Sequence, residues 1–133
     1  MFKLLRIKSN KRIEAIDITS YIINTIKTLD IKNGVLILYV PHTTAGIIIN
    51  ENSDPNVIED ILNRLAELVP EKLNYKHLEG NADSHIKSSL TSNSVILIIE
   101  NGELMLGTWQ GVFFLEFDGP RERKVYFKIL KNE

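Results

Sequence analysis

The sequence contains no cysteine, carries almost no net charge and has no long apolar segment. The lack of cysteine excludes disulfides, thiolate zinc sites, iron–sulfur clusters and a cysteine nucleophile, so any metal ion must be held by His, Asp or Glu. A formal net charge of -1 gives no overall attraction to nucleic acid or to an anionic membrane. No apolar run approaches the roughly 20 residues that span a bilayer, and the first residues lack the apolar stretch of a secretory signal. We therefore expect a cytoplasmic protein that binds neither nucleic acid nor membrane.

The length of 133 residues and the 44% hydrophobic content predict one domain, residues 1–133, with a substantial buried core. Nearly continuous apolar runs at 34–40, 47–49 and 94–99 predict strands that are covered on both faces. Two further strand-like pieces lie within residues 1–18, and a shift in their alternation predicts either a bulge or burial on both faces. Asn101-Gly102 is typical of a type I′ hairpin turn. Three more strands, forming an antiparallel meander, are expected at 104–109, 112–117 and 124–130.

Helix signals separate these strands. Thr19 or Ser20 can cap a helix that Asn33-Gly34 ends, and Asp54-Pro55 supplies an N-cap followed by proline at the first helical position. A short helix from Asn81 to about Leu90 is also expected. The fold class is therefore α+β: a mainly antiparallel β-sandwich of about eight strands with two or three helices packed outside.

All three histidines lie beside small polar residues, and imidazole is both a group that titrates near neutrality and the commonest nitrogen ligand for metals. His42 follows the end of a predicted buried strand, and Thr43 and Thr44 add two hydroxyls. Gly46 permits an unusual backbone angle there. The alternative is an ordinary turn in which the threonine side chains bind the local backbone.

His77 and His85 are eight positions apart, with Gly80 between them. We expect the two imidazoles to converge across a loop-to-helix turn, where Glu79 and Asp83 could orient them. The spacing matches no standard zinc finger, so a metal site and a hydrogen-bonded structural pair remain equally open.

Polar residues also follow the predicted strand at 47–49, which consists of three isoleucines. Asn50 and Glu51 come directly after it, and Glu51 becomes a base or a ligand only if that strand end abuts His42. Asp54 is fully explained as a helix cap.

Two motifs near the C-terminus complete the set. Gly107 and Gly111 flank Trp109, which is either an aromatic platform or a residue that fills the core or an oligomer contact. Arg121 and Arg123, two apart on a predicted strand, would point to the same side and could hold phosphate or carboxylate by bidentate bonds. A turn followed by solvated charges is the alternative.

Three separated segments carry a family resemblance: PHTTAGIIINENSDPNV from Pro41, HLEGNADSHIKSSL from His77 and NGELMLGTWQGVFFLEFDGPRER from Asn101. Together they resemble the small YjbQ-type proteins, also called the secondary thiamine-phosphate synthase family, from about Ile7 to Ile129. The resemblance implies a sandwich-like fold assembled as a homotrimer with sites near subunit contacts. It also implies that His42, His77 and His85 are motif histidines, and that the motif's acidic and amide positions are Glu51, Asp54, Glu79 and Asn81.

The activity implied by the resemblance joins hydroxymethylpyrimidine diphosphate to a thiazole phosphate and releases pyrophosphate. Such a reaction needs positive groups around the diphosphate, and Lys87, Arg121, Arg123 and a divalent metal ion could supply them. Zinc or magnesium is the candidate cofactor, with His42, His77 and His85 as its ligands or as the lining of an anion pocket. The catalytic candidates are His42, His77, His85 and Glu51. The substrate-binding candidates are Thr43, Thr44, Asn50, Asp54, Glu79, Asn81, Lys87, Trp109, Arg121 and Arg123.

Three functions remain open from the sequence. The first is a low-turnover transferase acting on small phosphorylated heterocycles. The second is a non-catalytic trimeric protein that binds a metal ion or an anionic metabolite. The third is a hydrolase that uses metal-bound water.

Overall fold

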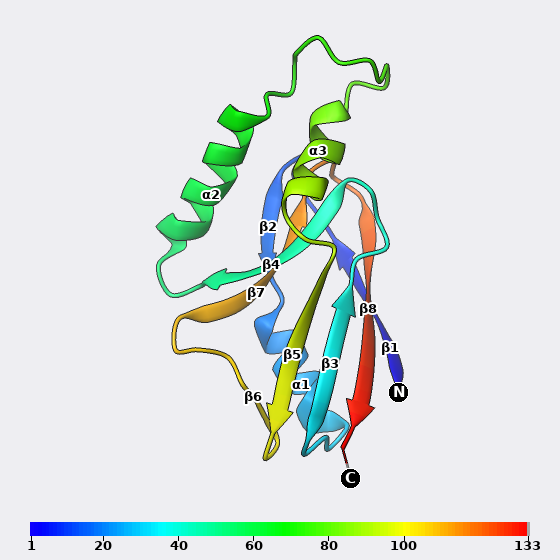
Figure 1. The fold of residues 1–133 in the computed structure, drawn as a ribbon, viewed down its shortest axis with the longest axis vertical. Helices are drawn as coiled ribbons and strands as arrows, with labels where there is room; N and C mark the ends of the chain where they lie inside the picture. The colour runs from blue at the N-terminus through cyan, green and yellow to red at the C-terminus, as the bar shows by residue number, and fades with distance from the viewer. Residues whose placement is uncertain (133) are drawn as a thin grey trace.

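The computed structural model describes residues 1–132 and confirms an α+β fold, with eight strands in two antiparallel sheets and three helices (Figure 1). The five-stranded sheet has the order β1-β8-β3-β5-β6. Its strands are β1 (Phe2–Lys8), β8 (Glu122–Lys131), β3 (Gly34–Tyr39), β5 (Ser94–Glu100) and β6 (Glu103–Leu104). The three-stranded sheet has the order β2-β7-β4, formed by β2 (Glu14–Asp17), β7 (Gln110–Glu116) and β4 (Ala45–Glu51). The helices are α1 (Thr19–Thr28), α2 (Pro55–Leu68) and α3 (Ala82–Leu90).

The main core lies between the two sheets. Alternate side chains of β3 and β8, such as Leu36 and Phe127, are fully buried against Ile47 and Phe114 of the smaller sheet. Helix α1 adds Ile22 and Ile26 to the same cluster. This alternation of buried and exposed residues is what a sheet with one covered face requires.

Strand β7 is buried on both faces, because α2 covers the side of the smaller sheet that faces away from the main core. Phe113, Leu115 and Phe117 form a second cluster there, against which Leu62 and Leu65 of α2 pack. None of the α2 side chains is fully buried, so this helix is held by half-buried contacts along one stripe.

Two local predictions are confirmed. Asp54 is the N-cap of α2, and its side chain accepts a hydrogen bond of 2.9 Å from the amide of Asn56. Asn101 and Gly102 both have positive φ angles, of 52° and 77°, as a type I′ turn requires.

Two strands lie within the first 18 residues, as predicted, but β1 and β2 belong to different sheets, so the shift in alternation does not mark a bulge within one strand. Other local predictions were wrong. Residues 104–109 do not form a full strand, since β6 ends at Leu104 and β7 then crosses to the smaller sheet. The N-cap of α1 is Ile18, and the side chain of Asp17, rather than that of Thr19 or Ser20, accepts a hydrogen bond from the amide of Thr19, the first helical residue.

The connection from β3 to β4 and the connection from α3 to β5 meet at one end of the sandwich. The amide of Val40 donates to the carbonyl of Asn93 over 2.7 Å, and the amide of Ile47 donates to that of Ser92 over 2.8 Å. Gly46 has no left-handed backbone angle, contrary to expectation. It is needed instead because a Cβ there would meet Thr91 Oγ1 at 2.6 Å. These contacts place the His42 loop beside the end of α3.

None of the helices described in residues 1–132 has the length and apolar character required to cross a bilayer.

We predict that Phe127→Ala destabilises the protein by about 3–5 kcal/mol, because it removes a fully buried ring and leaves a cavity between the sheets. The neighbouring exposed residue supplies the control, and Lys128→Ala should change the free energy of unfolding by less than about 0.5 kcal/mol. Urea denaturation at a fixed protein concentration measures both. Equal effects of the two substitutions would contradict the assignment of the core.

Candidate functional site: a histidine- and hydroxyl-lined pocket

A pocket of about 500 Å³ lies between the His42 loop and the end of α3. This volume is in the range of small-molecule sites. Its lining consists of two imidazoles and a row of hydroxyl and amide side chains: His42, Thr43, His85, Ser88, Ser89, Thr91, Ser92 and Asn93. Two of the three predicted histidines therefore share one cavity, and no carboxylate is among the lining residues.

The backbone of β8 fixes the chemical state of His42. The amide of Lys124 donates a hydrogen bond of 2.9 Å to His42 Nε2, so this nitrogen is an acceptor and the ring proton lies on Nδ1. Burial lowers the pKa of His42, and the positive charges of Arg123, Lys124 and Arg121 lower it further, while Glu116 opposes them. His42 is therefore a neutral N–H donor at neutral pH, in a positive local field.

His85 contacts His77 rather than His42. The two ring centroids lie 5.2 Å apart with the planes at 81°, an edge-to-face contact that confirms their expected convergence. His77 Nε2 lies 3.8 Å from Glu79 Oε2, and the side chain of His77 is half-exposed. Glu79 can thus orient His77, and His77 packs against the imidazole that lines the pocket.

Within residues 1–132, no group of three or more His, Asp or Glu side chains is arranged to hold a metal ion. His42 also has its Nε2 lone pair engaged by the Lys124 amide. In a single chain His42 and His85 line the pocket, while His77 packs against His85 and is not among the lining residues, so the three imidazoles do not surround one point.

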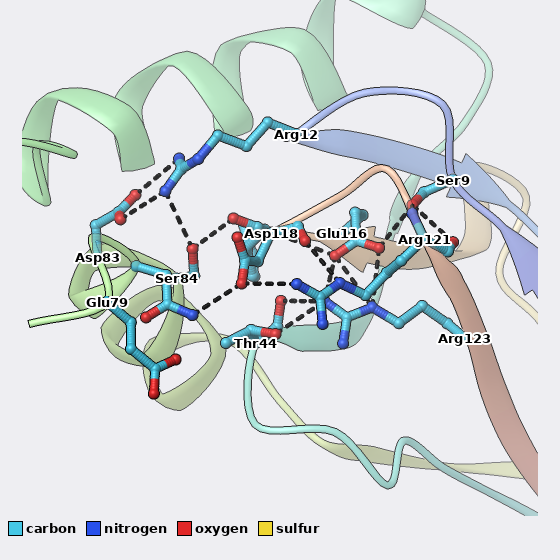
Figure 2. A network of polar contacts seen from close by, with 12 residues as sticks. Ser9, Arg12, Thr44, Glu79, Asp83, Ser84, Glu116, Asp118, Arg121 and Arg123 are labelled. Carbon is cyan, nitrogen blue, oxygen red and sulfur yellow. Dashed lines mark hydrogen bonds and ion pairs between the residues drawn. The ribbon is translucent and has the colours of Figure 1, made fainter.

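A buried ion pair holds the His42 loop in place. Arg123 is 3% exposed and donates through Nε to both carboxylate oxygens of Glu116, over 2.9 and 3.1 Å (Figure 2). Its Nη2 donates to the carbonyl and the hydroxyl of Thr44 over 3.2 and 2.8 Å. Ser9 also donates to Glu116. Arg123 and Thr44 were expected to bind substrate, and the structure places both in this internal network.

A second buried pair fixes α3. Lys87 is 1% exposed, and its Nζ lies 2.7 Å from Asp83 Oδ2. Arg12 also pairs with Asp83, at 2.8 Å (Figure 2). Ser84 donates to the carbonyl of Phe117. Lys87, another expected substrate ligand, therefore has its charge compensated inside the protein.

A third set of contacts joins α3 to the turn before β8. The Asn81 amide donates to Asp118 over 2.8 Å instead of capping α3, and its buried Oδ1 has no partner among residues 1–132. Asp118 also accepts from Arg121, whose side chain is half-exposed. In Figure 2 Glu79 lies apart from these contacts. Arg121 is thus the only one of the two expected phosphate-binding arginines that solvent can reach.

The remaining candidates lie at the opposite end of β4. Glu51 pairs in register with Gln110, whereas Ala45, next to the His42 loop, pairs with Glu116. Six steps along a strand separate the two ends by roughly 20 Å. Glu51 accepts from the Asp54 amide, and Asn50 accepts from the Glu51 amide. Trp109, 61% exposed, lies at the same end. Within one chain, therefore, none of these four candidates lies near His42: Asn50, Glu51, Asp54 and Trp109.

Sequence reasoning missed most of the residues that line the pocket. The cluster Ser88-Ser89-Leu90-Thr91-Ser92-Asn93 follows directly after the His85 helix and could have been found by its density of hydroxyls. Ser9, Arg12 and Glu116 carry the buried pairs, and no local sequence pattern marks them.

The fold and the pocket define a small two-sheet α+β protein with a polar site where the β3–β4 loop meets the end of α3. The sequence pattern of the family described as UPF0047 protein YjbQ-like matches residues 3–132. The chain belongs to this family.

Two relatives and two solved structures illustrate the similarity. A UPF0047 protein of Methanocaldococcus jannaschii is 58% identical over 128 residues, which cover 96% of this chain and 93% of the relative. The UPF0047 protein YugU of Bacillus subtilis is 50% identical over 131 residues, covering 98% and 99%. A YjbQ/UPF0047 family protein from Clostridium acetobutylicum superposes with a TM-score of 0.92 at 48% identity, covering 96% of this chain and 99% of that one.

The second structure, a protein from Aeropyrum pernix, has a TM-score of 0.94 at 34% identity and covers 99% of both chains. These relatives are named for the family or their organism and not for an activity. Membership therefore establishes the fold, and the chemistry has to be inferred from the pocket.

We predict that acid destabilises the protein through Glu116. Burial alone would raise the pKa of this carboxyl, but hydrogen bonds from Arg123 and Ser9 outweigh it and lower the pKa from its ordinary 4.5. Because the folded-state value is the lower one, the stabilisation is present above pH 4.5 and is lost as the pH falls through the lowered value. Urea denaturation between about pH 3 and 7 measures this dependence.

The substitution Glu116→Gln should flatten the acid limb and lower stability near neutral pH by about 3–5 kcal/mol, because it leaves Arg123 buried without a counter-charge. The control is Glu122→Gln, at an exposed position on β8. An acid limb in Glu116→Gln as steep as in the parent protein would show that other carboxyls carry the effect.

Proposed function

We propose that this protein is a low-turnover enzyme that acts on small phosphorylated heterocycles in the pocket between His42 and His85. The proposed reaction is that of a secondary thiamine-phosphate synthase, which joins hydroxymethylpyrimidine diphosphate to a thiazole phosphate and releases pyrophosphate. The observation that carries the proposal is the combination of a ligand-sized cavity with an excess of positive charge near its His42 side.

The charge distribution suits a departing anion. Arg121, Arg123 and Lys124 surround His42, and Glu116 is the carboxylate that opposes them there. Fixed positive charges near the site stabilise the negative charge that grows on a leaving diphosphate. Arg123 is buried, with its Nε and Nη2 bonded to Glu116 and Thr44, so it would act through its field alone. The exposed side chain of Lys124 is the one proposed to contact an anion directly, whereas Arg121 would first have to leave Asp118.

The neutral pocket residues would orient the substrate. The Nδ1 proton of His42 and the exposed side chains of Thr43 and Asn93 offer donors to phosphate oxygens. His85 is the candidate for proton transfer, with His77 and Glu79 holding its ring. This division makes His42 a binding residue and His85 the first choice for a catalytic one.

An anion pocket is favoured over a three-histidine metal site. His42 can bind a metal through Nε2 only after losing its bond to the Lys124 amide, and each ligand imidazole must present a free lone pair. A divalent ion such as magnesium, bound mainly through substrate phosphates, remains compatible with this arrangement.

Homotrimer formation is part of the proposal, and the outer face of the five-stranded sheet supports it. Around β3 and β5 many cross-strand neighbours on this face are apolar and at least partly exposed, and an exposed apolar patch of this kind marks an interaction surface. Its most exposed members are Phe2, Tyr39, Ile96, Ile98, Met105 and Leu130. As a further part of the proposal, Glu51 and Trp109 would complete the pocket of a neighbouring subunit, because one chain holds them at the opposite end of β4 from its own His42 loop.

We predict that purified protein releases pyrophosphate when given the pyrimidine diphosphate and the thiazole phosphate, and that His85→Ala lowers the rate by about 10²-fold or more. His42→Ala should raise KM more than it lowers kcat, because it removes a binding contact. The control Lys32→Ala removes an exposed lysine that pairs with Asp30. A pyrophosphate-release assay with both substrates at varied concentration gives these constants.

Binding of both substrates without turnover would establish the trimeric binding protein instead. Release of phosphate from generic phosphomonoesters, abolished by chelation, would establish the metal-dependent hydrolase. Either outcome would overturn the proposed synthase.

A complementation experiment tests the shared site. We predict that the protein elutes at three times the chain mass by light scattering, and that mixing inactive His85→Ala with inactive Glu51→Gln restores part of the activity. Restoration is expected because mixed trimers contain some sites with both native side chains. Ile96→Asp, on the exposed apolar face, should yield monomers. An active monomer, full activity of Glu51→Gln alone, or mixtures of two inactive variants that stay inactive would each contradict a site shared between subunits.

A further inference from the structure

Four hydroxyl side chains of the pocket have their hydrogen atoms committed to backbone carbonyls. Ser88 Oγ donates to Ala45 over 2.7 Å, and Ser89 Oγ donates to His85 over 2.9 Å. We call the set the hydroxyl wall: Ser88, Ser89, Thr91 and Ser92.

The hydroxyls of Thr91 and Ser92 also donate to backbone carbonyls. Thr91 Oγ1 donates to the carbonyl of Lys87 over 3.0 Å, and Ser92 Oγ donates to that of Ser94 over 2.6 Å. A carbonyl oxygen has no proton to give, so the direction of each of these bonds is fixed by chemistry. Every hydroxyl of the wall can therefore offer a ligand only its lone pairs.

The position of the wall reinforces this polarity. It begins in the last turn of α3, which ends at Leu90, and continues into the connection to β5. The C-terminal end of a helix carries partial negative charge. Acceptor lone pairs and a negative helix end both attract N–H donors and cations, and both disfavour phosphate oxygens.

The opposite side of the pocket has the reverse character. His42 there is an N–H donor, because its Nε2 accepts from Lys124, and the cations Arg121, Arg123 and Lys124 surround it. A single cavity of about 500 Å³ thus has a donor-rich, positive side and an acceptor-rich, negative side. Such a pocket is complementary to a ligand whose two ends carry opposite polarity.

We propose that the pocket selects phosphorylated ligands that also carry an amino or ammonium group, with the phosphate toward His42 and the N–H donors bound by the hydroxyl wall. This inference rests on the proposed function for the phosphate end and adds a selectivity element at the other end. The hydroxyl wall is a binding element and takes no part in proton transfer.

Isothermal titration of the full chain with a matched pair of ligands tests the inference. Phosphoethanolamine and ethyl phosphate share the phosphate and differ in the ammonium group. The wall predicts that phosphoethanolamine binds roughly ten- to a hundredfold more tightly, the gain expected from charge-assisted hydrogen bonds. Inorganic pyrophosphate serves as the probe for the phosphate end alone.

Variants assign the preference to its residues. Ser89→Ala removes a hydroxyl that bonds only within its own helix, so the fold should be preserved, and Ser88→Ala and Thr91→Val extend the series. The preference for phosphoethanolamine should fall severalfold in each variant while the affinity for ethyl phosphate stays constant. His42→Ala should weaken both ligands equally. Ser20→Ala, an exposed serine of α1, is the matched control and should change neither ligand.

Each result is decisive. Equal affinity for the two phosphates overturns the hydroxyl wall and leaves the anion pocket standing. A preference that survives in the serine and threonine variants overturns its assignment to the wall. Failure of both phosphates and of pyrophosphate to bind overturns the proposed function and this inference with it.

Discussion

The site depends on one buried ion pair, between Arg123 and Glu116. Neither charge can be desolvated alone at acceptable cost, so each requires the other and a full set of hydrogen bonds. Ser9 and Thr44 supply the rest of those bonds, which ties β8, β7, the β1–β2 connection and the His42 loop at one point. The side chain of Arg123 points inward, and the backbone amide of the next residue, Lys124, donates to His42 Nε2. The ion pair therefore sets the position and the tautomer of the imidazole two residues from Thr44.

Helix α3 is also held in place by buried charged groups. Its first turn is held by Asp83, which is compensated by Arg12 and Lys87, and by Ser84, which bonds to the end of β7. All these contacts lie outside the pocket, yet they fix the helix whose last turn begins the hydroxyl wall. The molecule thus uses its buried charges to hold structure, while neutral polar groups line the pocket.

This division explains what the sequence could and could not predict. The positions of the strands, the Asp54 cap and the Asn101-Gly102 turn were predictable, because each depends on local periodicity or turn chemistry. The prediction that 94–99 is covered on both faces was wrong, since Ile96 and Ile98 of β5 are exposed on the outer face of the five-stranded sheet. The pairing of His77 with His85 was also predictable, since they are eight positions apart and Gly80 lies between them. Roles that depend on contacts between residues far apart in the sequence could not be predicted. In the sequence Glu116 resembles the polar end of a strand. Its hydrogen-bond partners, however, lie 107 positions earlier, at Ser9, and seven positions later, at Arg123.

Charge is therefore a poor local guide to function in this fold. Lys87 and Arg123 have the residue types expected of phosphate ligands, but their donors face carboxylates that would otherwise be buried alone. The serines after His85 look like a solvated helix end, yet they line the cavity.

Hydrogen-bond direction gives the more reliable guide to what the cavity can hold. Residue type leaves a hydroxyl or a neutral imidazole free to donate or to accept, so composition alone does not determine which ligand group it binds. A backbone partner removes this ambiguity: a carbonyl makes the hydroxyl an acceptor toward the ligand, and an amide makes the imidazole a donor. The positive field around His42 adds attraction that is screened by salt over a Debye length of about 8 Å. The bonds at the wall are short-ranged and much less sensitive to salt. Under the proposed function, long-range attraction therefore favours any anion, while the fixed polarity of the neutral groups decides which anions fit.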